Sequence, residues 1–272
     1  MAEALSIALT VLTTFLRKGL DKQFDSERLA KVGLALLENQ VFYKEILYTR
    51  LVKYLSCTQR NDGGWVDVEE TAWSTAYLRK FFGEYEGPLN KGLNWLAEQR
   101  ISGAGWGRNN RDAPRIPYTS WVAILCPELI DKEVLKWLEK ACNDEIKLET
   151  NLTYKIALPI LAFSKHKYSA QDPELINSLL TYLISSQNED GGFAPWREHP
   201  CGSDPWCTSV AVLGLLANAD KVQEVVLKRT LDWLLKNQLP NGMWPYHYID
   251  EGTALAYWAL KELLIYFKRK EH

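Results

Sequence analysis

Apolar residues recur along the chain in helix-length runs that are separated by glycine-rich polar turns. In the first run, Leu5, Leu9, Leu12 and Leu16 are spaced three or four residues apart, which places them on one face of an α-helix. No segment alternates apolar and polar residues between hairpin turns, so few strands are expected. The pattern predicts helices at 4–18, 26–38, 41–57, 70–82, 88–98, 118–127, 131–141, 151–164, 173–186, 206–218, 222–236 and 252–268.

Four segments repeat the same order of residues: a glutamine near a helix end, a glycine turn, and then an aromatic residue. The glutamines are Gln59, Gln99, Gln187 and Gln238, and the aromatic residues are Trp65, Trp106, Phe193 and Trp244. A threonine followed by a small residue then opens the next run, at Thr71, Thr119, Thr208 and Thr253. The glutamines are 40, 88 and 51 residues apart, so a degenerate unit is expected within 125–165.

Repeats of this length indicate stacked helical hairpins. The twelve predicted helices form six pairs. A closed ring of six pairs would bury both end repeats, whereas an open solenoid usually needs polar terminal repeats, and neither end here is obviously polar. We therefore expect one domain over residues 1–272, with N-terminal helices in residues 1–40 docked on it.

These repeats resemble the QW motifs of the squalene–hopene and oxidosqualene cyclase family, from about residue 40 to residue 265. The resemblance implies an all-α fold, a single (α/α)6 toroid like the β domain of terpene cyclases. Full-length triterpene cyclases have two such domains and this chain has room for one, so it looks most like the family's single-domain meroterpenoid cyclases. The superfamily also contains protein prenyltransferase subunits, so the fold alone does not choose a chemistry.

One acidic stretch resembles the acid motif of class II cyclases. Asp67-Val68-Glu69-Glu70-Thr71-Ala72 is similar to Asp-x-Asp-Asp-Thr-Ala, with Glu replacing the second and third Asp. The match implies that Glu69 donates a proton to the substrate and that Glu70 and Asp67 tune or orient it. Burial and nearby negative charge keep a carboxyl group protonated, while a helix N-terminus strengthens the acid. The alternative is an ordinary helix start, where acidic residues are common.

In several family members a histidine assists the acid from the next repeat. The corresponding stretch here is Tyr118-Thr119-Ser120-Trp121, without histidine. The helper is therefore either absent or replaced by Tyr118 or Asn109.

The chain is rich in aromatic residues, with 11 Trp and 13 Tyr. In a class II cyclase, aromatic faces would stabilise carbocations and exclude water. For each residue, core packing is the alternative. The candidate substrate-binding residues are Trp65, Trp73, Tyr77, Asn109, Tyr118, Trp121, Phe193, Trp196, Trp206, Tyr246, Tyr248 and Tyr257.

Arginines follow two of the turns: Arg108, Arg111 and Arg115 after Trp106, and Arg197 after Trp196. They would hold a substrate carboxylate or phosphate, or else they belong to solvated loops. An anion site favours a prenylated aromatic acid or a prenyl diphosphate over squalene. The predicted function is thus an isomerase-type cyclase that converts a linear isoprenoid, a farnesylated aromatic acid, into a polycyclic product.

Two other functions stay open at this stage. A zinc-dependent prenyltransferase-like enzyme would use Asp204, Cys207 and His247, although their spacing departs from that family's. The other is a non-catalytic binding module, which would expose apolar patches. For the cyclase we expect no metal and no cofactor, and Mg²⁺ would help only with a diphosphate substrate.

Composition adds expectations about partners and location. The net charge of −2 gives no case for nucleic acid. Five cysteines without a Cys-x-x-Cys pair are typical of reduced, cytoplasmic thiols. The N-terminal apolar run is too short to span a bilayer, and docking of its helix is expected. A peripheral membrane contact through Phe15, Arg17 and Lys18 is the alternative. Oligomeric state is left open.

Overall fold

The computed structural model describes residues 2–37, 45–81, 83–148 and 151–270. All regular structure in these ranges is helical, and no strand occurs there. The helices are α1 (Ala2–Lys22), α2 (Ser26–Leu37), α3 (Glu45–Thr58), α4 (Val68–Arg79), α5 (Glu86–Gln99), α6 (Ile116–Leu125), α7 (Lys132–Glu145), α8 (Thr153–Lys165), α9 (Leu175–Ser185), α10 (Pro205–Leu216), α11 (Glu224–Lys236) and α12 (Ile249–Lys270). Each predicted helix is present within a few residues of its expected bounds. The predicted boundaries at 38, 41 and 82 lie outside the described residues.

The helices group into two compact units, whose boundaries fall within α1 and α7. The N-terminal unit comprises residues 13–138, and the C-terminal unit comprises residues 139–272 with residues 1–12. The single domain expected from the sequence stays a prediction, and residues 1 and 38–40 of its expected N-terminal part lie outside the described ranges.

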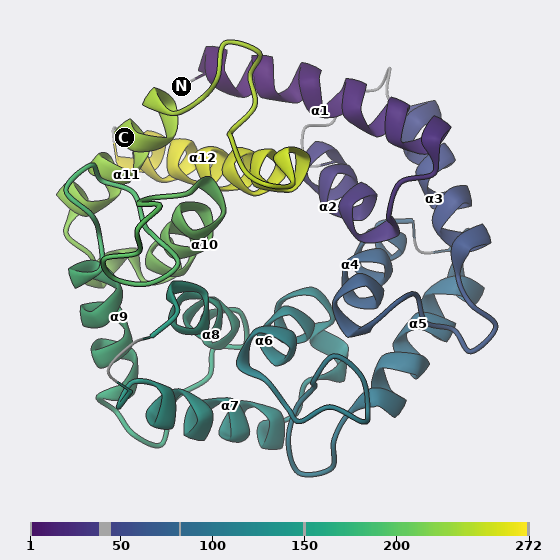
Figure 1. Cartoon of the computed structure of the whole chain (residues 1–272). Coiled ribbons are helices and arrows are strands. Elements are labelled where there is room, and N and C mark those ends of the chain that lie inside the picture. The colour runs from purple at the N-terminus through teal and green to yellow at the C-terminus, as the bar shows by residue number, and fades with distance from the viewer. Residues whose placement is uncertain (1, 38–44, 82, 149–150, 271–272) are drawn as a thin grey trace. The chain divides into compact units, whose positions relative to one another are not determined.

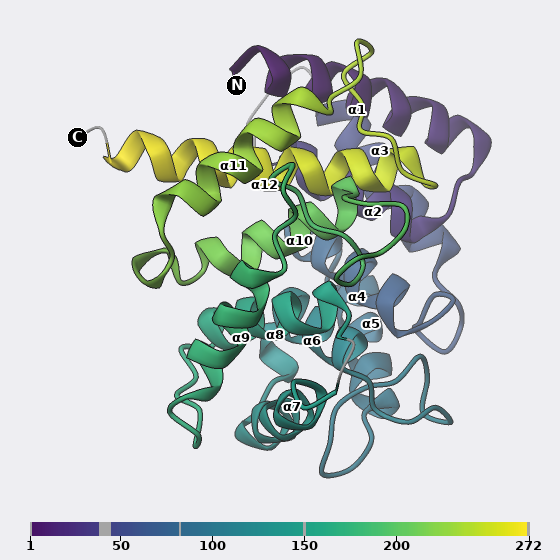
Figure 2. The same ribbon diagram turned by 60° about the vertical axis from the view of Figure 1, so that its left-hand side comes forward.

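Within each unit, alternate helices pack side by side and the helices between them pack against this row. The N-terminal unit contains the row α2, α4, α6, and the C-terminal unit contains the row α8, α10, α12. Figures 1 and 2 both show α10 between α8 and α12. In α4 and α10, ten of the twelve residues are buried, because a helix with neighbours on several sides is enclosed on most of its surface. We call these six helices the row helices.

A threonine hydroxyl fastens each glycine turn to the row helix that follows it. In all four repeats the threonine Oγ1 accepts a hydrogen bond from the backbone N–H of the aromatic residue, at 2.9–3.1 Å. The pairs are Trp65–Thr71, Trp106–Thr119, Phe193–Thr208 and Trp244–Thr253. These aromatic residues are at most 2% exposed, so the hydroxyl satisfies an N–H that has lost its access to water.

The repeated glutamine links its own turn to the next helix outside the row. Gln59 Nε2 donates to Gly63 O and to Pro88 O of α5. Gln187 Nε2 makes the corresponding bonds to Gly191 O and to Val226 O of α11. Gln99 differs, because its side-chain oxygen accepts from Asn110 N.

The N-terminal segment completes the last repeat. Gln238 Nε2 donates to Gly242 O and to Ala4 O of α1, so Ala4 takes the place that Pro88 has in the first repeat. Gly242, with φ of 85°, faces Ile7, three residues after this acceptor. Gly63 faces Lys91 in the same way, again three residues after the acceptor. The start of α1 therefore serves as the helix that follows α12.

Helix α1 has a buried apolar face, and the docking of the N-terminal helices on a single domain stays a prediction. Leu12 and Leu16 have no exposed surface. None of the helices in the described ranges combines the length and apolar composition that crossing a bilayer requires.

The threonine hydrogen bond is testable on α4, which also carries a matched control. Thr71→Val keeps the shape of the side chain and leaves the buried N–H of Trp65 without its acceptor, so we expect the free energy of unfolding to fall by about 1–3 kcal/mol. Thr75, one turn later, is equally buried but its hydroxyl has no partner among the described residues. Thr75→Val should therefore leave stability unchanged or raise it. Urea denaturation measures both, and equal losses in the two variants would contradict the assignment.

Candidate active site

The first turn of α4 carries the three predicted acids, and each has a different environment. Asp67 is the N-cap residue, with φ of −149° and ψ of −172°. Its Oδ1 accepts from Glu70 N at 3.0 Å, and its Oδ2 accepts from Arg108 Nε at 3.2 Å. Asp67 is thus engaged both by the helix start and by a guanidinium.

Glu70 folds back over the same helix start. Its Oε2 accepts from Val66 N at 3.1 Å, and the residue is 7% exposed. Together with the bond from Glu70 N to Asp67, this arrangement is similar to a capping box. Burial raises the pKa of Glu70, and the negative charges of Glu27 and Asp67 raise it further, while the hydrogen bond from Val66 N lowers it. Glu70 is therefore a carboxyl group whose surroundings favour the protonated form.

Glu69 instead contacts a cation from another helix. Its Oε1 lies 3.3 Å from Lys31 Nζ of α2. Lys31 also pairs with Glu27, one turn earlier on α2. The Lys31 side chain is 1% exposed, whereas the Glu69 side chain is 23% exposed. The two ends of this ion pair thus differ: the ammonium is enclosed and the carboxyl group remains accessible.

Lys31 and Glu27 are not among the site residues predicted from the sequence. Spaced four apart on a helix, they read as an ordinary surface ion pair. One signal was available, because Lys31 is the only charged residue between Leu29 and Leu37. A lysine within such an apolar run is rarely buried unless it has a partner.

Two predicted aromatic residues adjoin this ion pair. The Trp73 ring centroid lies 5.3 Å from Lys31 Nζ and 4.9 Å from the ring centroid of Trp121 on α6. The Trp73 indole N–H is buried and has no acceptor among the described residues. Glu69, Lys31, Trp73 and Trp121 consequently form one connected cluster within the N-terminal unit, which we call the acid cluster.

Two other candidates of this unit have contacts of their own. Trp65 donates through Nε1 to Thr58 Oγ1 at 3.2 Å and is 2% exposed. Tyr77 has no exposed surface, and its hydroxyl donates to Tyr48 O at 3.3 Å. Burial holds the pKa of Tyr77 well above its ordinary value. Both side chains pack in the interior, and a role in lining a substrate cavity stays a prediction for them.

Of the two helper candidates, Tyr118 is in electrostatic contact with the acids. Burial raises the pKa of Tyr118, the negative charges of Asp67 and Glu69 raise it further, and Arg108 and Arg115 oppose them. Asn109 is exposed, and its side-chain oxygen accepts from Arg111 N at 2.9 Å within its own turn. The geometry therefore favours Tyr118 as the neighbour of Glu69.

The arginines after Trp106 are largely paired with acids of the protein. Arg108 pairs with Asp67, and Arg115 Nη2 lies 2.8 Å from Asp112 Oδ1. The hydrogen bond from Arg108 N and the bond from the Arg115 side chain lower the pKa of Asp112. Binding of a substrate anion by this loop stays a prediction.

The remaining aromatic candidates belong to the C-terminal unit. Phe193 and Tyr257 are at most 2% exposed, whereas Tyr248 is 50% exposed. Trp206 meets Tyr154 edge to face, with ring centroids 5.5 Å apart. Ring contacts also join Trp196 to His199, at 4.1 Å, and Tyr246 to His247, at 4.0 Å. Whether these residues line a cavity with the acids stays a prediction.

Asp204 and Cys207, two of the three residues considered as zinc ligands, are hydrogen-bonded to each other. Asp204 is the N-cap of α10, and its Oδ1 accepts from Cys207 N at 2.8 Å. Burial and the charge of Asp204 raise the pKa of the Cys207 thiol, whereas zinc requires the thiolate. Within the described residues, no three His, Cys, Asp or Glu side chains are grouped so that they could hold a metal ion. The geometry does not favour the prenyltransferase-like alternative.

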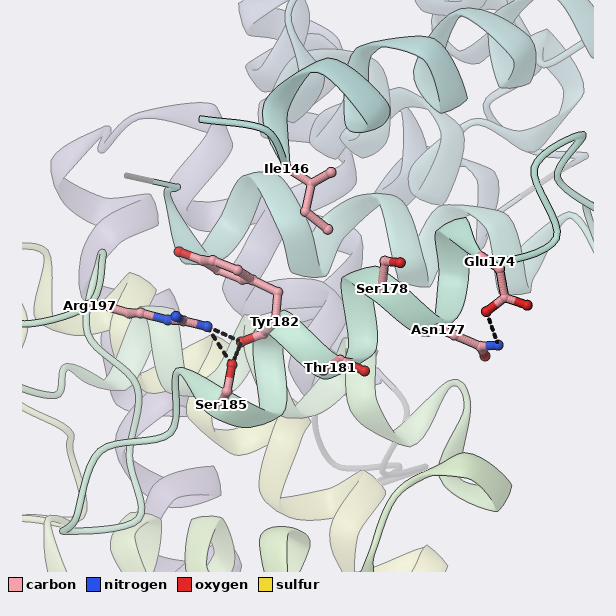
Figure 3. Close-up of a pocket in the computed structure, with 8 residues that line it drawn as sticks. All are labelled: Ile146, Glu174, Asn177, Ser178, Thr181, Tyr182, Ser185 and Arg197. Atoms are coloured by element: carbon pink, nitrogen blue, oxygen red, sulfur yellow. Dashed lines mark hydrogen bonds between the residues drawn. The ribbon is translucent and has the colours of Figure 1, made fainter. Parts of the chain in front are cut away.

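A surface pocket lies on α9 in the C-terminal unit, with a volume of about 450 Å³ (Figure 3). Seven of its eight lining residues have polar or charged side chains, among them Asn177, Thr181, Tyr182 and Arg197. The Arg197 guanidinium is held by Tyr182 O, at 3.2 Å, and stacks over the Tyr182 ring at 4.2 Å. Arg197 thus contacts the end of α9, and binding of a substrate anion by Arg197 stays a prediction. The predicted acids and aromatic residues do not line this pocket.

Comparisons with known proteins give a likeness of fold. No protein-family model matches the chain. The type II terpene cyclase MstE from Scytonema, in its apo form, matches with a TM-score of 0.75 at 17% identity, over 98% of each chain. A variant of MstE in complex with geranylgeranyl dihydroxybenzoate, its substrate, matches with a TM-score of 0.73 at 16% identity, over 97% of this chain and 99% of that chain.

One curated relative matches in sequence. Lanosterol synthase from Pneumocystis carinii is 32% identical over a stretch that covers 32% of this chain and 15% of that enzyme. The match thus spans a small part of the relative's length. At 16–17% identity, the likeness to the MstE structures shows the fold alone. It confirms the all-α, terpene-cyclase-like toroid class that the repeats predicted.

The raised pKa of Glu70 predicts a pH-dependent stability. Because its pKa is higher in the folded than in the unfolded chain, its contribution is fully present below the ordinary glutamate value and is lost as pH rises through the raised value. Glu70→Gln should remove this loss of stability, so the free energy of unfolding of the variant should increase relative to that of the wild type as pH rises. Urea denaturation, at pH values from below the ordinary glutamate pKa to above the raised pKa of Glu70, measures the difference. Glu86→Gln, in the exposed first turn of α5, controls for loss of one surface charge, and a pH-independent Glu70→Gln difference would contradict the assignment.

Proposed function

We propose that this protein is a class II terpene cyclase, an isomerase-type enzyme that starts cyclisation by protonating a linear isoprenoid. The observation that carries the proposal is the acid cluster: an accessible glutamate in the first turn of α4 is paired with Lys31, whose ammonium lies over the Trp73 ring, and Trp73 contacts Trp121 of α6. The fold that this chain shares with a type II terpene cyclase supports the same chemistry.

Glu69 is the proposed proton donor, because its side chain is the more accessible of the two glutamates in the motif. Glu70 is buried against the helix start, and Asp67 caps the helix while paired with Arg108. These two acids would hold Glu69 in place and add negative charge that keeps a proton on the cluster. Protonation of an alkene or epoxide by a positioned acid is general acid catalysis.

The aromatic residues would stabilise the cations that follow. Trp73 and Trp121 have neighbouring indole rings, and Trp73 lies 5.3 Å from Lys31 Nζ, the partner of Glu69. A ring face attracts positive charge. We extend this role to the full set predicted from the sequence, with Asn109 as a polar contact. The set is Trp65, Trp73, Tyr77, Asn109, Tyr118, Trp121, Phe193, Trp196, Trp206, Tyr246, Tyr248 and Tyr257.

We propose a prenylated aromatic acid as the substrate, with a farnesyl chain as first choice. Its structural neighbour binds geranylgeranyl dihydroxybenzoate, which is a member of the same chemical class. The reaction as proposed needs no cofactor and no metal, and Mg²⁺ would help only with a diphosphate substrate. A cytoplasmic location, with transient contact of α1 with membranes that dissolve such lipids, belongs to the same proposal.

A product assay tests the proposal. Purified protein would be incubated with farnesylated and geranylgeranylated dihydroxybenzoic acid, farnesyl diphosphate and squalene, with and without chelator. We expect an isomeric, cyclised product from a prenylated acid, unaffected by chelator. Glu69→Gln keeps the shape of the side chain but has no acidic proton, so turnover should fall by about 100-fold or more.

Glu86→Gln is the control for this assay, since Glu86 also lies in the first turn of a helix but is exposed on α5. It should retain wild-type turnover. Full activity of Glu69→Gln would reject the proposed donor. No product from any of the four substrates, or activity that depends on bound zinc, would reject the proposed cyclisation.

A further inference from the structure

Lys31 is an ammonium enclosed by protein. Its side chain is 1% exposed, and Nζ contacts Glu27 and Glu69 and lies 5.3 Å from the Trp73 ring. Burying an ammonium group is costly unless it is paired and hydrogen-bonded. A lysine at this place on α2 is therefore tolerated because of its carboxyl partners, one of which is the proposed proton donor.

Two carboxyl groups are among the partners of the Lys31 ammonium. Glu27 makes the shorter contact from the same helix, and Glu69 lies 3.3 Å away on α4. In surroundings of low dielectric constant, opposite charges that offset each other are favoured. An ionised Glu27 offsets the charge of Lys31 while Glu69 holds a proton. When Glu69 gives that proton to the substrate, its new negative charge forms beside the ammonium.

Other charged and titratable groups lie near Glu69 within the N-terminal unit. Asp67 and Glu70 belong to the same helix start. Tyr118 of α6 interacts electrostatically with Glu69 and also with Arg108 and Arg115 of the preceding loop. Arg108 is 61% exposed and is bonded to Asp67, so solvent screens its charge. The Lys31 ammonium is enclosed and in direct contact with Glu69, so its effect should exceed that of Arg108.

We infer that Lys31, together with Glu27, is a positioning residue for Glu69. It fixes the carboxyl group of the donor by an ion pair across α2 and α4, and it stabilises the carboxylate that proton transfer leaves behind. Glu27 offsets part of the ammonium charge, so that Glu69 stays protonated before the reaction. This role of Lys31 rests on the proposed function of Glu69 as the proton donor.

The two partners should shift the titration of Glu69 in opposite directions. Lys31→Met removes the ammonium and should raise the titration midpoint of the Glu69 carboxyl by about 1–2 pH units, because an adjacent cation favours the ionised form. Glu27→Gln removes a negative charge that offsets the ammonium and should lower that midpoint. The ¹³C NMR signal of the Glu69 carboxyl, assigned through Glu69→Gln, measures both in the protein without substrate. Unchanged midpoints in both variants would overturn the inference.

Kinetics test the same role during turnover. In Lys31→Met the donor is a weaker acid, so kcat should fall by about 10-fold or more, KM should change little, and the alkaline limb of the pH–rate profile should move up by about 1–2 pH units. Lys31→Arg should restore most of the rate, since it keeps the charge. Lys228→Met, which breaks the exposed 2.6 Å pair of Lys228 with Glu224 on α11, should leave the profile unchanged.

The two experiments separate this inference from the proposed function. A protein that turns over none of the substrates, yet shows opposite midpoint shifts, has the Lys31–Glu69 coupling but is not the proposed cyclase. The inference fails if the protein cyclises its substrate but Lys31→Met loses activity equally at every pH and Lys31→Arg does not restore it. Lys31 would then serve only the folding of the protein. Circular dichroism and the melting temperature establish that each variant is folded.

Discussion

The buried N-terminus of α4 is the constraint on which the candidate site depends. The first N–H groups of a helix have no partners within it, and when the helix start is enclosed, side chains must supply them. Here Asp67 accepts from Glu70 N, and Glu70 reaches back to Val66 N. Two carboxyl groups are thus held next to each other by hydrogen bonds that the fold needs in any case. The third acid, Glu69, lies between them in the sequence, so their negative charges act on it.

The same need recurs at every glycine turn and is met by the same residues. A threonine hydroxyl accepts the aromatic N–H in all four repeats, as in Trp244–Thr253. In three of the four, a glutamine amide also reaches the next helix. Because these bonds are local or nearly so, a short pattern of Gln, Gly, aromatic and Thr is enough to specify one repeat. In the last repeat the acceptor of Gln238 is Ala4, so the first helix of the chain takes the role that a following helix has elsewhere.

This difference between local and distant contacts decides what could be predicted. The helices were predictable because glycine turns and apolar spacing mark their ends. Asp67, Glu69 and Glu70 could be proposed as one group because they lie within four successive residues of the sequence. The contacts of Lys31 and Ala4 could not be predicted, because their partners lie 38 and 234 residues away in the sequence. The contacts of the candidate aromatic residues, such as the interior bonds of Trp65 and Tyr77, are likewise set by packing rather than by any pattern in the sequence.

The position of Lys31 gives a physical reason why residue 69 of the acid motif is glutamate rather than aspartate. A glutamate side chain is longer than aspartate by one carbon–carbon bond, about 1.5 Å. Glu69 uses its length to come within 3.3 Å of an ammonium on a neighbouring helix, a distance that the shorter side chain would not cover from the same backbone. The motif and the lysine therefore depend on each other: the longer acid reaches the cation, and in the proposed reaction the cation would compensate the charge that Glu69 acquires when it gives up its proton.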